Sequence, residues 1–184
     1  MKLSELCNLI SGFQGKTVQG NQYSQIKLKD VTKDGKIKYD QLEKFNCDKV
    51  NDKYLLKKGD IILKAKSGDN TAALVDTDIK NIVPASHFII ISVNDTKVIT
   101  PEYLVAYLNS EYAQDYFKVN AEGTALPIIK IKTLGDLEIK VVELEKQKEI
   151  ADMYKLMKDE KELMEQIMEN REKQFTSYLR EKLN

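Results

Sequence analysis

The chain has 184 residues, enough for one domain with its own hydrophobic core and an appendage but not for two full domains. Charged residues make up 32% of it, and no apolar run approaches the roughly 20 residues of a membrane span, so we expect a soluble protein. The N-terminal residues lack the apolar stretch of a signal peptide, and Cys7 and Cys47 lack metal-ligand spacing, so both are expected to be free thiols in the cytoplasm.

The net charge is zero, but the basic residues are not evenly spread. Between Lys16 and Lys66 there are 13 lysines against 7 acidic residues. A local basic patch on a neutral protein is typical of phosphate contact with a nucleic acid. Lysine is also the general solubilising residue here, since 27 of the 29 basic residues are Lys, so the patch alone leaves both interpretations open.

The first part of the chain predicts a short helix and then a β-hairpin. Apolar residues at helical spacing predict a turn or helix that ends at Ser11-Gly12: Leu3, Leu6, Leu9 and Ile10. Gly15, Gly20 and Asn21 mark loops. Residues 33–36 then form a turn between two alternating segments, 25–29 and 36–39, which together predict a hairpin.

The middle of the chain predicts further strands. Residues 54–56 and 61–63 flank the turn Lys58-Gly59-Asp60 as a second strand–turn–strand unit. Residues 72–75 and 87–93 predict two more strands. The second of these is nearly all apolar, which predicts a central position in a sheet.

Two short helices and a last strand are predicted next. Thr100 suits an N-cap and Pro101 suits the first helical position, so a helix begins there and is followed by a second one over residues 111–117. Residues 123–127 predict a loop and residues 139–142 a strand. The pattern as a whole predicts an α+β fold, with a mixed or antiparallel β-rich domain and short helices over residues 1–142.

Residues 143–184 predict one long coiled-coil-type α-helix, because neither Gly nor Pro interrupts them. About forty helical residues would span about 60 Å. A seam at heptad spacing predicts pairing with the same helix of a second copy, through Ile150, Tyr154, Met157, Met164, Met168, Phe175 and Tyr178. Lys161, Arg171 and Lys182 interrupt the seam, which indicates looser pairing than in a leucine zipper. The alternative is a helix that folds back on its own domain.

Several segments resemble, in order and spacing, the target recognition domain of type I restriction–modification specificity (S) subunits. The resemblance runs from about Leu3 to Ala151. Single pieces, such as the turn Gly59-Asp60 before a strand, are common in proteins. Three motifs are specific in combination: Pro101-Glu102-Tyr103-Leu104 with Asn109-Ser110, Gly123-Thr124-Ala125-Leu126-Pro127, and Leu144-Glu145-Lys146-Gln147.

The resemblance implies a non-catalytic subunit that recognises a sequence in double-stranded DNA. A methyltransferase (M) subunit would bind it and supply the S-adenosylmethionine chemistry, so no cofactor is expected in this chain, and a restriction (R) subunit would cleave the DNA. S subunits usually have two recognition domains and two spacer helices, whereas this chain has one of each. It therefore resembles a half-length S subunit, and a homodimer would restore the reader of a bipartite site. It also lacks the prolines that usually precede the Leu-Glu-x-Gln motif.

A reader of DNA sequence needs cations for phosphates and side-chain donors and acceptors for base edges. The loop at residues 14–22, the lysines that alternate along the predicted hairpin and the loop after residue 63 offer both kinds of group. The candidate DNA-binding residues are Lys16, Gln19, Lys27, Lys29, Lys36, Lys38, Lys64, Lys66, Ser67, Asn70, Thr124 and Lys130. For each of them the alternative is a solvated loop residue.

No catalytic or metal site is predicted. His87, the only histidine, has no nucleophile, base or metal ligand at recognisable spacing, so a packed or surface residue at a strand end is the simpler interpretation. Asp76 and Asp78 lack a third ligand and suit a turn, and Cys7 suits a core. The alternative function is a coiled-coil scaffold or regulator that binds protein partners without DNA. A small hydrolase is disfavoured because a site for it is missing.

Overall fold

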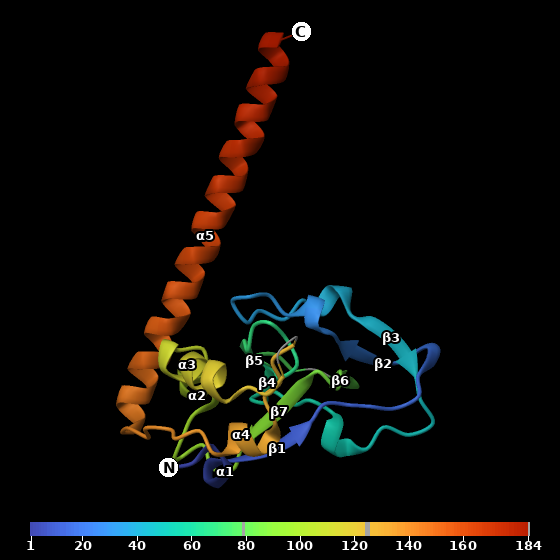
Figure 1. The fold of residues 1–184 in the computed structure, drawn as a ribbon. Coiled ribbons are helices and arrows are strands. Elements are labelled where there is room, and N and C mark those ends of the chain that lie inside the picture. The colour runs from blue at the N-terminus through green and yellow to red at the C-terminus, as the bar shows by residue number, and fades with distance from the viewer. Residues whose placement is uncertain (79, 124–125, 184) are drawn as a thin grey trace.

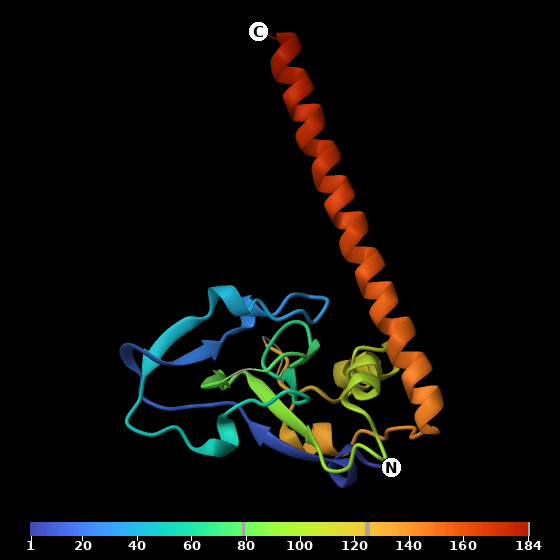
Figure 2. The ribbon, with the colours of Figure 1, turned by 180° about the vertical axis from the view of Figure 1, so that it is seen from behind.

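The computed structural model describes residues 1–78, 80–123 and 126–183. A mixed α/β body carries one long helix, α5 (Leu144–Leu183), which projects away from the body (Figures 1 and 2). The N-terminus lies at the base of the body, on the side where α5 begins. In the described residues, no helix is long and apolar enough to cross a membrane.

A four-stranded antiparallel sheet forms the centre of the body, with strand order β1-β7-β4-β5. Its strands are β1 (Cys7–Ser11), β4 (Ile61–Lys64), β5 (Ala72–Leu74) and β7 (Phe88–Val93). β7 is an interior strand, as its apolar run predicts. The predicted N-terminal helix is wrong beyond its first turn, α1 (Leu3–Leu6), because residues 7–11 pair with β7 and satisfy the hydrogen bonds of that edge.

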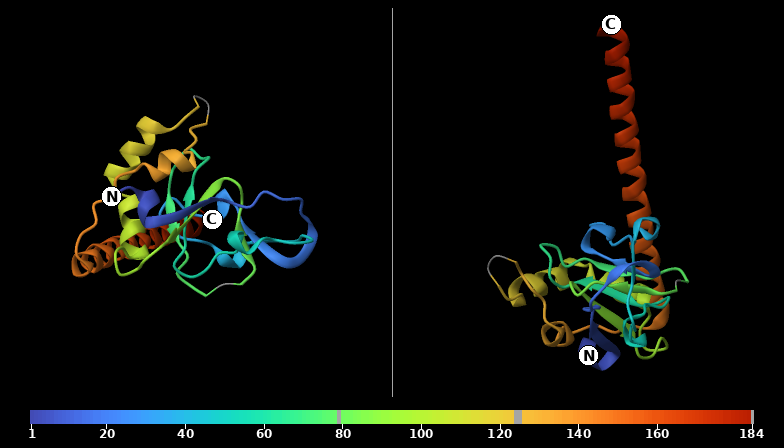
Figure 3. Two further views of the ribbon diagram at one scale, coloured as in Figure 1. Left: turned by 90° about the horizontal axis from the view of Figure 1, so that it is seen from below. Right: turned by 90° about the vertical axis from the view of Figure 1, so that its right-hand side faces the viewer.

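A three-stranded sheet lies at the end of the body away from the start of α5 (Figure 3). Its strand order is β3-β2-β6, and its strands are β2 (Val18–Ile26), β3 (Glu43–Asn46) and β6 (Ile82–Pro84). β2 runs antiparallel to β3 and parallel to β6. None of these three strands was predicted with these bounds. β3 and β6 are too short to show a sequence period.

The loop predicted from Gly20 and Asn21 is instead a bulge inside β2. The Asn46 Oδ1 accepts hydrogen bonds from the backbone N–H groups of Asn21, at 3.0 Å, and Gln22, at 2.9 Å. A Cβ on Gly20 would lie only 2.0 Å from the Asn46 side chain, so the close approach requires glycine. The glycine that suggested a loop therefore marks a bulge, where one strand bends around an asparagine of its neighbour.

The turn predicted at residues 33–36 forms, and the Thr32 N–H donates to the Lys36 carbonyl oxygen at 3.0 Å. The segments 25–29 and 36–39, however, do not pair as arms of a hairpin. β2 ends at Ile26 and a 3-10 turn follows, η1 (Leu28–Asp30), in which the buried Asp30 carboxylate accepts the Lys27 N–H at 2.8 Å. A second turn, η2 (Tyr39–Gln41), leads into β3. Between the turns, a single bridge joins Val31 to Ile37, and both side chains are buried. These residues therefore contribute two buried side chains to the core and do not add a strand to the three-stranded sheet.

Helices cover one face of the central sheet. α2 (Pro101–Leu108) and α3 (Glu111–Asn120) confirm the two predicted helices, and the Thr100 hydroxyl accepts the Tyr103 N–H at 3.3 Å as an N-cap. A short helix, α4 (Ile131–Gly135), was not predicted. Alternate residues of β4 enter two different cores: Ile61 and Leu63 pack with α2 and α3, while Ile62 packs with Ile26 on the opposite face. The sheet is therefore buried on both faces, which explains its nearly continuous apolar strands.

The segments 54–56 and 139–142, predicted as strands, are not strands. The first begins as a 3-10 turn, η3 (Asp52–Tyr54). The second is an extended segment whose carbonyl groups accept from side chains and from the N-terminus. Tyr103 donates its hydroxyl to the Lys140 carbonyl oxygen at 2.5 Å, and the Met1 amino group donates to the Ile139 oxygen at 3.1 Å. The Tyr103 hydroxyl and the N-terminal amino group thus supply hydrogen bonds that a neighbouring strand would otherwise supply.

Candidate nucleic-acid interface

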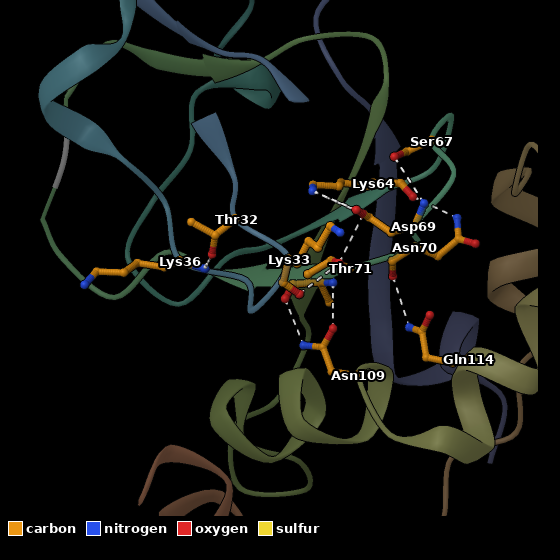
Figure 4. Close-up of polar contacts among 11 residues, drawn as sticks. Thr32, Lys33, Lys36, Lys64, Ser67, Asp69, Asn70, Thr71, Asn109 and Gln114 are labelled. Atoms are coloured by element: carbon orange, nitrogen blue, oxygen red, sulfur yellow. Dashed lines mark hydrogen bonds and ion pairs between the residues drawn. The ribbon is translucent and has the colours of Figure 1, made fainter. Parts of the chain in front are cut away.

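The loop after β4 was expected to present two lysines to DNA, but the structure gives them different roles. Lys64 is only 4% exposed, and its ammonium group pairs with the Asp69 carboxylate at 3.1 Å. Asp69 also accepts from the Thr71 hydroxyl at 3.1 Å (Figure 4). To reach a phosphate, this ammonium group would have to leave both its buried position and the Asp69 carboxylate. The structure therefore gives Lys64 a role within its own loop, and its contact with DNA stays a prediction.

Other polar groups of this loop also serve its own structure. The Asn70 amide donates to the Lys64 carbonyl oxygen at 2.9 Å, and the Ser67 hydroxyl accepts the Asp69 N–H at 3.4 Å (Figure 4). Lys66 lies half-buried beside them, and its backbone bridges to Ile128. No ion pair among the described residues involves Lys66. It is therefore the cation of this loop that is available to a phosphate.

Asn109, at the end of the Pro-Glu-Tyr-Leu motif, joins the helices to the edge of the central sheet. Its Oδ1 accepts the Ala72 N–H at 2.9 Å, and its Nδ2 donates to the carbonyl oxygens of Ala72 and Val105, both at 2.9 Å. Figure 4 shows Asn109 reaching toward the strand that carries the loop. This amide pairs with the backbone N–H and carbonyl groups at the edge of β5, as a neighbouring strand would. It also acts as a cap at the C-terminal end of α2. The motif residue therefore fixes the loop relative to the helices.

The lysines of the predicted hairpin do not share a strand face, because the segments 25–29 and 36–39 do not pair with each other. Lys27 forms an ion pair with Glu43 of β3, and this hydrogen-bonded contact lowers the pKa of the Glu43 carboxyl below its usual value. Lys36 forms an ion pair with Glu162 of α5 at 2.6 Å. Lys29 and Lys38 are exposed. Of the four, only the last two remain without an ion-pair partner in the described parts of the chain.

The remaining candidates lie on exposed surfaces. Lys16 lies in the loop before β2, and Gln19 lies on β2 opposite Phe45 of β3. Lys130 pairs with Glu122 at 2.6 Å, next to the bridge between Glu122 and Ile128. Thr124 lies outside the described residues.

The structure brings three segments that are distant in sequence around one hollow of about 460 Å³, at residues 13–17, 25–29 and 85–87. Two of the predicted residues, Lys27 and Lys29, line it. The other polar side chains of its lining are Gln14, Thr17, Gln25, Ser86 and His87. Gln25, Ser86 and His87 were not among the candidate residues. The sequence carried no local signal for them, because only the tertiary structure places residue 87 beside residue 25.

Gln147, the glutamine of the Leu-Glu-x-Gln motif, anchors the start of α5 to the body. It is fully buried, and its Oε1 accepts the Thr100 N–H at 2.9 Å. Its Nε2 donates to the carbonyl oxygens of Val98, at 2.9 Å, and Val142, at 2.8 Å. The same residue that caps α2, Thr100, is therefore tied to α5. These three hydrogen bonds join the first turn of α5 to the segment before α2 and to the end of the body.

Beyond its first turns, α5 presents an apolar seam to solvent. Six of the seven predicted seam residues are exposed: Ile150, Met157, Met164, Met168, Phe175 and Tyr178. The seventh, Tyr154, packs against the core of its own body, and this burial raises the pKa of its hydroxyl. Tyr154 therefore makes an intramolecular contact, and its part in dimer pairing stays a prediction. The alternative of a helix folded back on its domain applies to the N-terminal part of α5, which contacts the body.

Two ion pairs connect α5 to the loop between η1 and η2. Besides Lys36–Glu162, Lys161 of α5 pairs with Asp34 of that loop at 2.5 Å. Hydrogen bonding to these carboxylates raises the pKa of Lys36 and of Lys161. Between the two pairs, burial lowers the pKa of Lys158. The loop that was expected to bind DNA as a hairpin therefore braces the helix.

In the residues that the structure describes, no group of three or more His, Cys, Asp or Glu side chains is placed to hold a metal ion. Cys7 and Cys47 are free thiols, and burial raises the pKa of Cys7 to about 12. At that pKa the Cys7 thiol is protonated at neutral pH and is a core residue.

Comparison with known proteins identifies the family of the body. Residues 16–139 match the TaqI-like C-terminal specificity domain. Over 118 residues the chain is 31% identical to the type I restriction enzyme HindI specificity subunit of Haemophilus influenzae, which covers 62% of this chain and 26% of that subunit. The family match includes the Pro101-Glu102-Tyr103-Leu104 motif and ends before Leu144.

Solved structures share the fold of the body and helix together. The S subunit of a type I restriction–modification system from M. genitalium superposes with a TM-score of 0.61 at 17% identity, over 94% of this chain and 42% of that one. The HsdS subunit from Thermoanaerobacter tengcongensis gives 0.66 at 18% identity, over 92% and 44%. A chain from a type I restriction–modification system studied for its complex assembly gives 0.69 at 14% identity, over 92% and 40%.

This chain therefore spans less than half the length of the relatives that it matches. The match to the specificity-domain family covers more than half of the chain, and the likeness to the S-subunit fold covers nearly all of it. The chain belongs to the TaqI-like specificity-domain family of type I restriction–modification specificity (S) subunits, as its motifs predicted.

Proposed function

We propose that this chain is the sequence-specific DNA-recognition subunit of a type I restriction–modification complex in the cytoplasm. It directs methyltransferase and nuclease subunits to a bipartite site and is itself non-catalytic. The observation that carries the proposal is the family match over residues 16–139 on a body that carries a long projecting helix. The body, residues 1–142, reads DNA, and residues 143–184 set its distance from a second reader.

Among the candidate residues, DNA contacts are assigned to the lysines that have no ion-pair partner in the described residues, namely Lys16, Lys29, Lys38 and Lys66. Ammonium groups hold phosphates and so supply affinity, whereas side-chain amides and hydroxyls supply sequence discrimination. Gln19, Ser67 and Thr124 stay candidates for the second role, while Lys27, Lys36 and Lys130 would have to leave a carboxylate in order to bind DNA.

The second reader in this proposal is a second copy of the same chain. The apolar seam of α5 is exposed over most of its length. An exposed apolar stripe of this length is covered best by another helix. Since the chain spans 40–44% of the S-subunit chains that share its fold, two copies restore about one such subunit. A two-fold axis between the copies makes the preferred DNA an interrupted palindrome.

The M subunit in this proposal binds the body and α5 and supplies S-adenosylmethionine chemistry, and the R subunit joins through M. The alternative function, a coiled-coil scaffold that binds only proteins, shares the helix pairing but not the DNA contacts. The two are separated by co-expression with the methyltransferase encoded beside this chain. We expect the two proteins to co-elute and the complex to retard specific DNA duplexes in a gel. The logarithm of its DNA affinity should fall linearly with the logarithm of the salt concentration.

Methylome sequencing of a host that carries both proteins then defines the site. We expect a bipartite motif with identical inverted halves. Asymmetric halves would mean that a different reader completes the complex. Co-elution without any DNA shift at low salt, and without any new methylated motif, would favour the scaffold.

A further inference from the structure

We propose that the hollow between residues 13–17, 25–29 and 85–87 is the base-reading site of this chain, with Gln14, Gln25 and His87 as specificity-determining residues. The inference rests on the proposed function, since it names the reading residues of the same interface. Neither Gln25 nor His87 belongs to the set of DNA-binding residues that the sequence predicted, and the histidine was interpreted as a structural residue.

The hollow is a built feature, because backbone hydrogen bonds lock its three walls together. Gly12 donates its N–H to the Phe88 carbonyl oxygen at 2.8 Å, and Ala85 donates its N–H to the Ile26 oxygen at 2.9 Å. A Cβ on Gly12 would lie 2.1 Å from the Ala85 oxygen, so the two segments meet at a distance that only glycine permits. Side chains on these walls are therefore held at fixed positions, as a specificity site requires.

In the described part of the chain, three polar side chains of the hollow have free hydrogen-bonding groups, whereas five other amides are engaged within the fold. Asn46, Asn70, Asn109, Gln114 and Gln147 all bind backbone groups. Among the residues that the structure describes, no hydrogen bond engages the side-chain amides of Gln14 and Gln25 or the ring of His87. Both glutamines and the histidine line the hollow. Exposed amides elsewhere in the described residues, such as Asn94, are also free, but Gln14, Gln25 and His87 lie together around one hollow that a ligand can enter.

The charges of the hollow suit a nucleic acid. The ionised side chains of its lining are the lysines Lys27 and Lys29, and no carboxylate lines it. On the other side of His87, the backbone N–H groups of Ala65 and Lys66 donate to the His87 carbonyl oxygen at 2.8 and 3.1 Å, which places Lys66 next to the histidine. Lys27 is paired with Glu43, so Lys29 is the lining lysine that has no ion-pair partner in the described residues, and the Lys66 backbone lies next to His87. Phosphate contacts beside base-edge contacts are the common arrangement of a DNA reader.

The chemistry of the three residues indicates what they read. A glutamine amide both donates and accepts, so it can bind the N6 and N7 atoms of adenine in a bidentate manner in the major groove. An imidazole offers one donor and one acceptor when neutral and two donors when protonated. The hollow is therefore assigned to the major-groove edges of base pairs in each half-site, with adenine favoured opposite Gln14 and Gln25.

The test uses the full chain with its methyltransferase subunit and a library of duplexes with a randomised segment. Sequences enriched by binding are read for the wild type and for the single variants Gln14→Ala, Gln25→Ala and His87→Ala. The matched control is Asn94→Ala, an exposed amide just beyond the other end of β7 from His87. Thermal unfolding of each variant confirms that the fold is kept.

We expect each hollow variant to accept a second base at one or two positions of each half-site, with discrimination there reduced on the order of 10-fold. The control should enrich the wild-type motif. Unchanged motifs in all three hollow variants would overturn the inference, and so would a uniform loss of affinity for every sequence, which would show phosphate contact alone. If the wild type itself enriched no motif, the proposed function would fail, and this outcome is distinct from the previous two.

Discussion

The body and α5 obtain their stability from different sources. In the body, the central sheet is buried on both faces and the polar loops are tied by side-chain hydrogen bonds. In α5, 40 residues long, Gln147 and Ala151 are the residues that are buried. Helices in water gain most of their stability from packing an apolar face, so the distal part of α5 depends on a partner, whereas the body does not. Under the proposed function, the body would be a reader that is stable alone, and α5 would be a spacer that is stabilised by pairing.

The largest change in stability should come from variants that disrupt the pairing of α5. Replacing Met157 and Met164 by Lys places two ammonium groups in the pairing surface, and their desolvation should cost several kcal/mol of dimer stability. We expect sedimentation to give half the wild-type mass and circular dichroism to show loss of distal helix. The control is Gln166→Lys with Asn170→Lys, about half a turn away around the helix, which should keep the dimer. An unchanged mass for the methionine variant would reject pairing through this seam.

The next effect tests the junction between the two regions. Gln147→Leu removes an amide that satisfies the Thr100 N–H and two carbonyl oxygens, and it should lower the free energy of unfolding by about 3 kcal/mol. Gln174→Leu, on the exposed surface of the same helix, should change it by less than about 0.5 kcal/mol. Urea denaturation measures both. Equal effects of the two variants would mean that the junction does not hold α5.

A smaller effect separates the two lysines of the loop after β4. Lys66→Ala should weaken binding and reduce the slope of log affinity against log salt by about one, because a phosphate contact is lost. Lys64→Met should leave that slope unchanged and lower the free energy of unfolding by about 1 kcal/mol, because Asp69 loses its partner. DNA binding at several salt concentrations, together with urea denaturation, distinguishes the two roles. A reduced slope for the Lys64 variant would contradict the buried ion pair.

The smallest effect concerns the brace between the loop 32–38 and α5. Lys36 and Lys161 are exposed, so their ion pairs with Glu162 and Asp34 should be screened by salt. Because the pKa values of both lysines are raised in the folded state, the contribution is complete at neutral pH. It is lost as the pH rises above the ordinary value of 10.5 and through the raised values.

The double variant Lys36→Ala, Lys161→Ala should speed hydrogen exchange in residues 32–38 at low salt and change little at high salt. The exposed Lys146→Ala on the same helix serves as control. Faster exchange that persists equally at high salt would point to a packing change instead of an ionic one.

The regular elements with strong periodic or capping signals were predictable from sequence. Thr100-Pro101 marked the start of α2, the apolar run of residues 87–93 marked the interior strand β7, and the absence of Gly and Pro after residue 143 marked α5. The turn at residues 33–36 forms as predicted, but residues 25–29 do not pair with 36–39, because the chain leaves β2 at Ile26 for a 3-10 turn and the antiparallel bridge joins Val31 to Ile37 instead. Gly20 was misread because a glycine is required equally by a loop and by a bulge.

The candidate site was predictable only in part. Lysines are recognisable in a sequence, but whether one faces DNA or a carboxylate depends on contacts across the fold. Lys64 meets Asp69 five residues later, whereas Lys36 meets Glu162 on a helix 126 residues away. The amides of Gln147 and Gln25 are chemically identical, yet one is buried with three partners and the other lines an open hollow.

The sequence by itself determined the family, the two-part organisation and the long helix, because motif order, heptad spacing and the absence of helix breakers are properties of the linear chain. The tertiary structure alone decided which polar side chains are satisfied within the molecule and which remain free. It brought Gln14, Gln25 and His87 together from three segments. The physical reason is that hydrogen-bond satisfaction is a non-local property: a donor is free only when no other part of the folded chain has reached it.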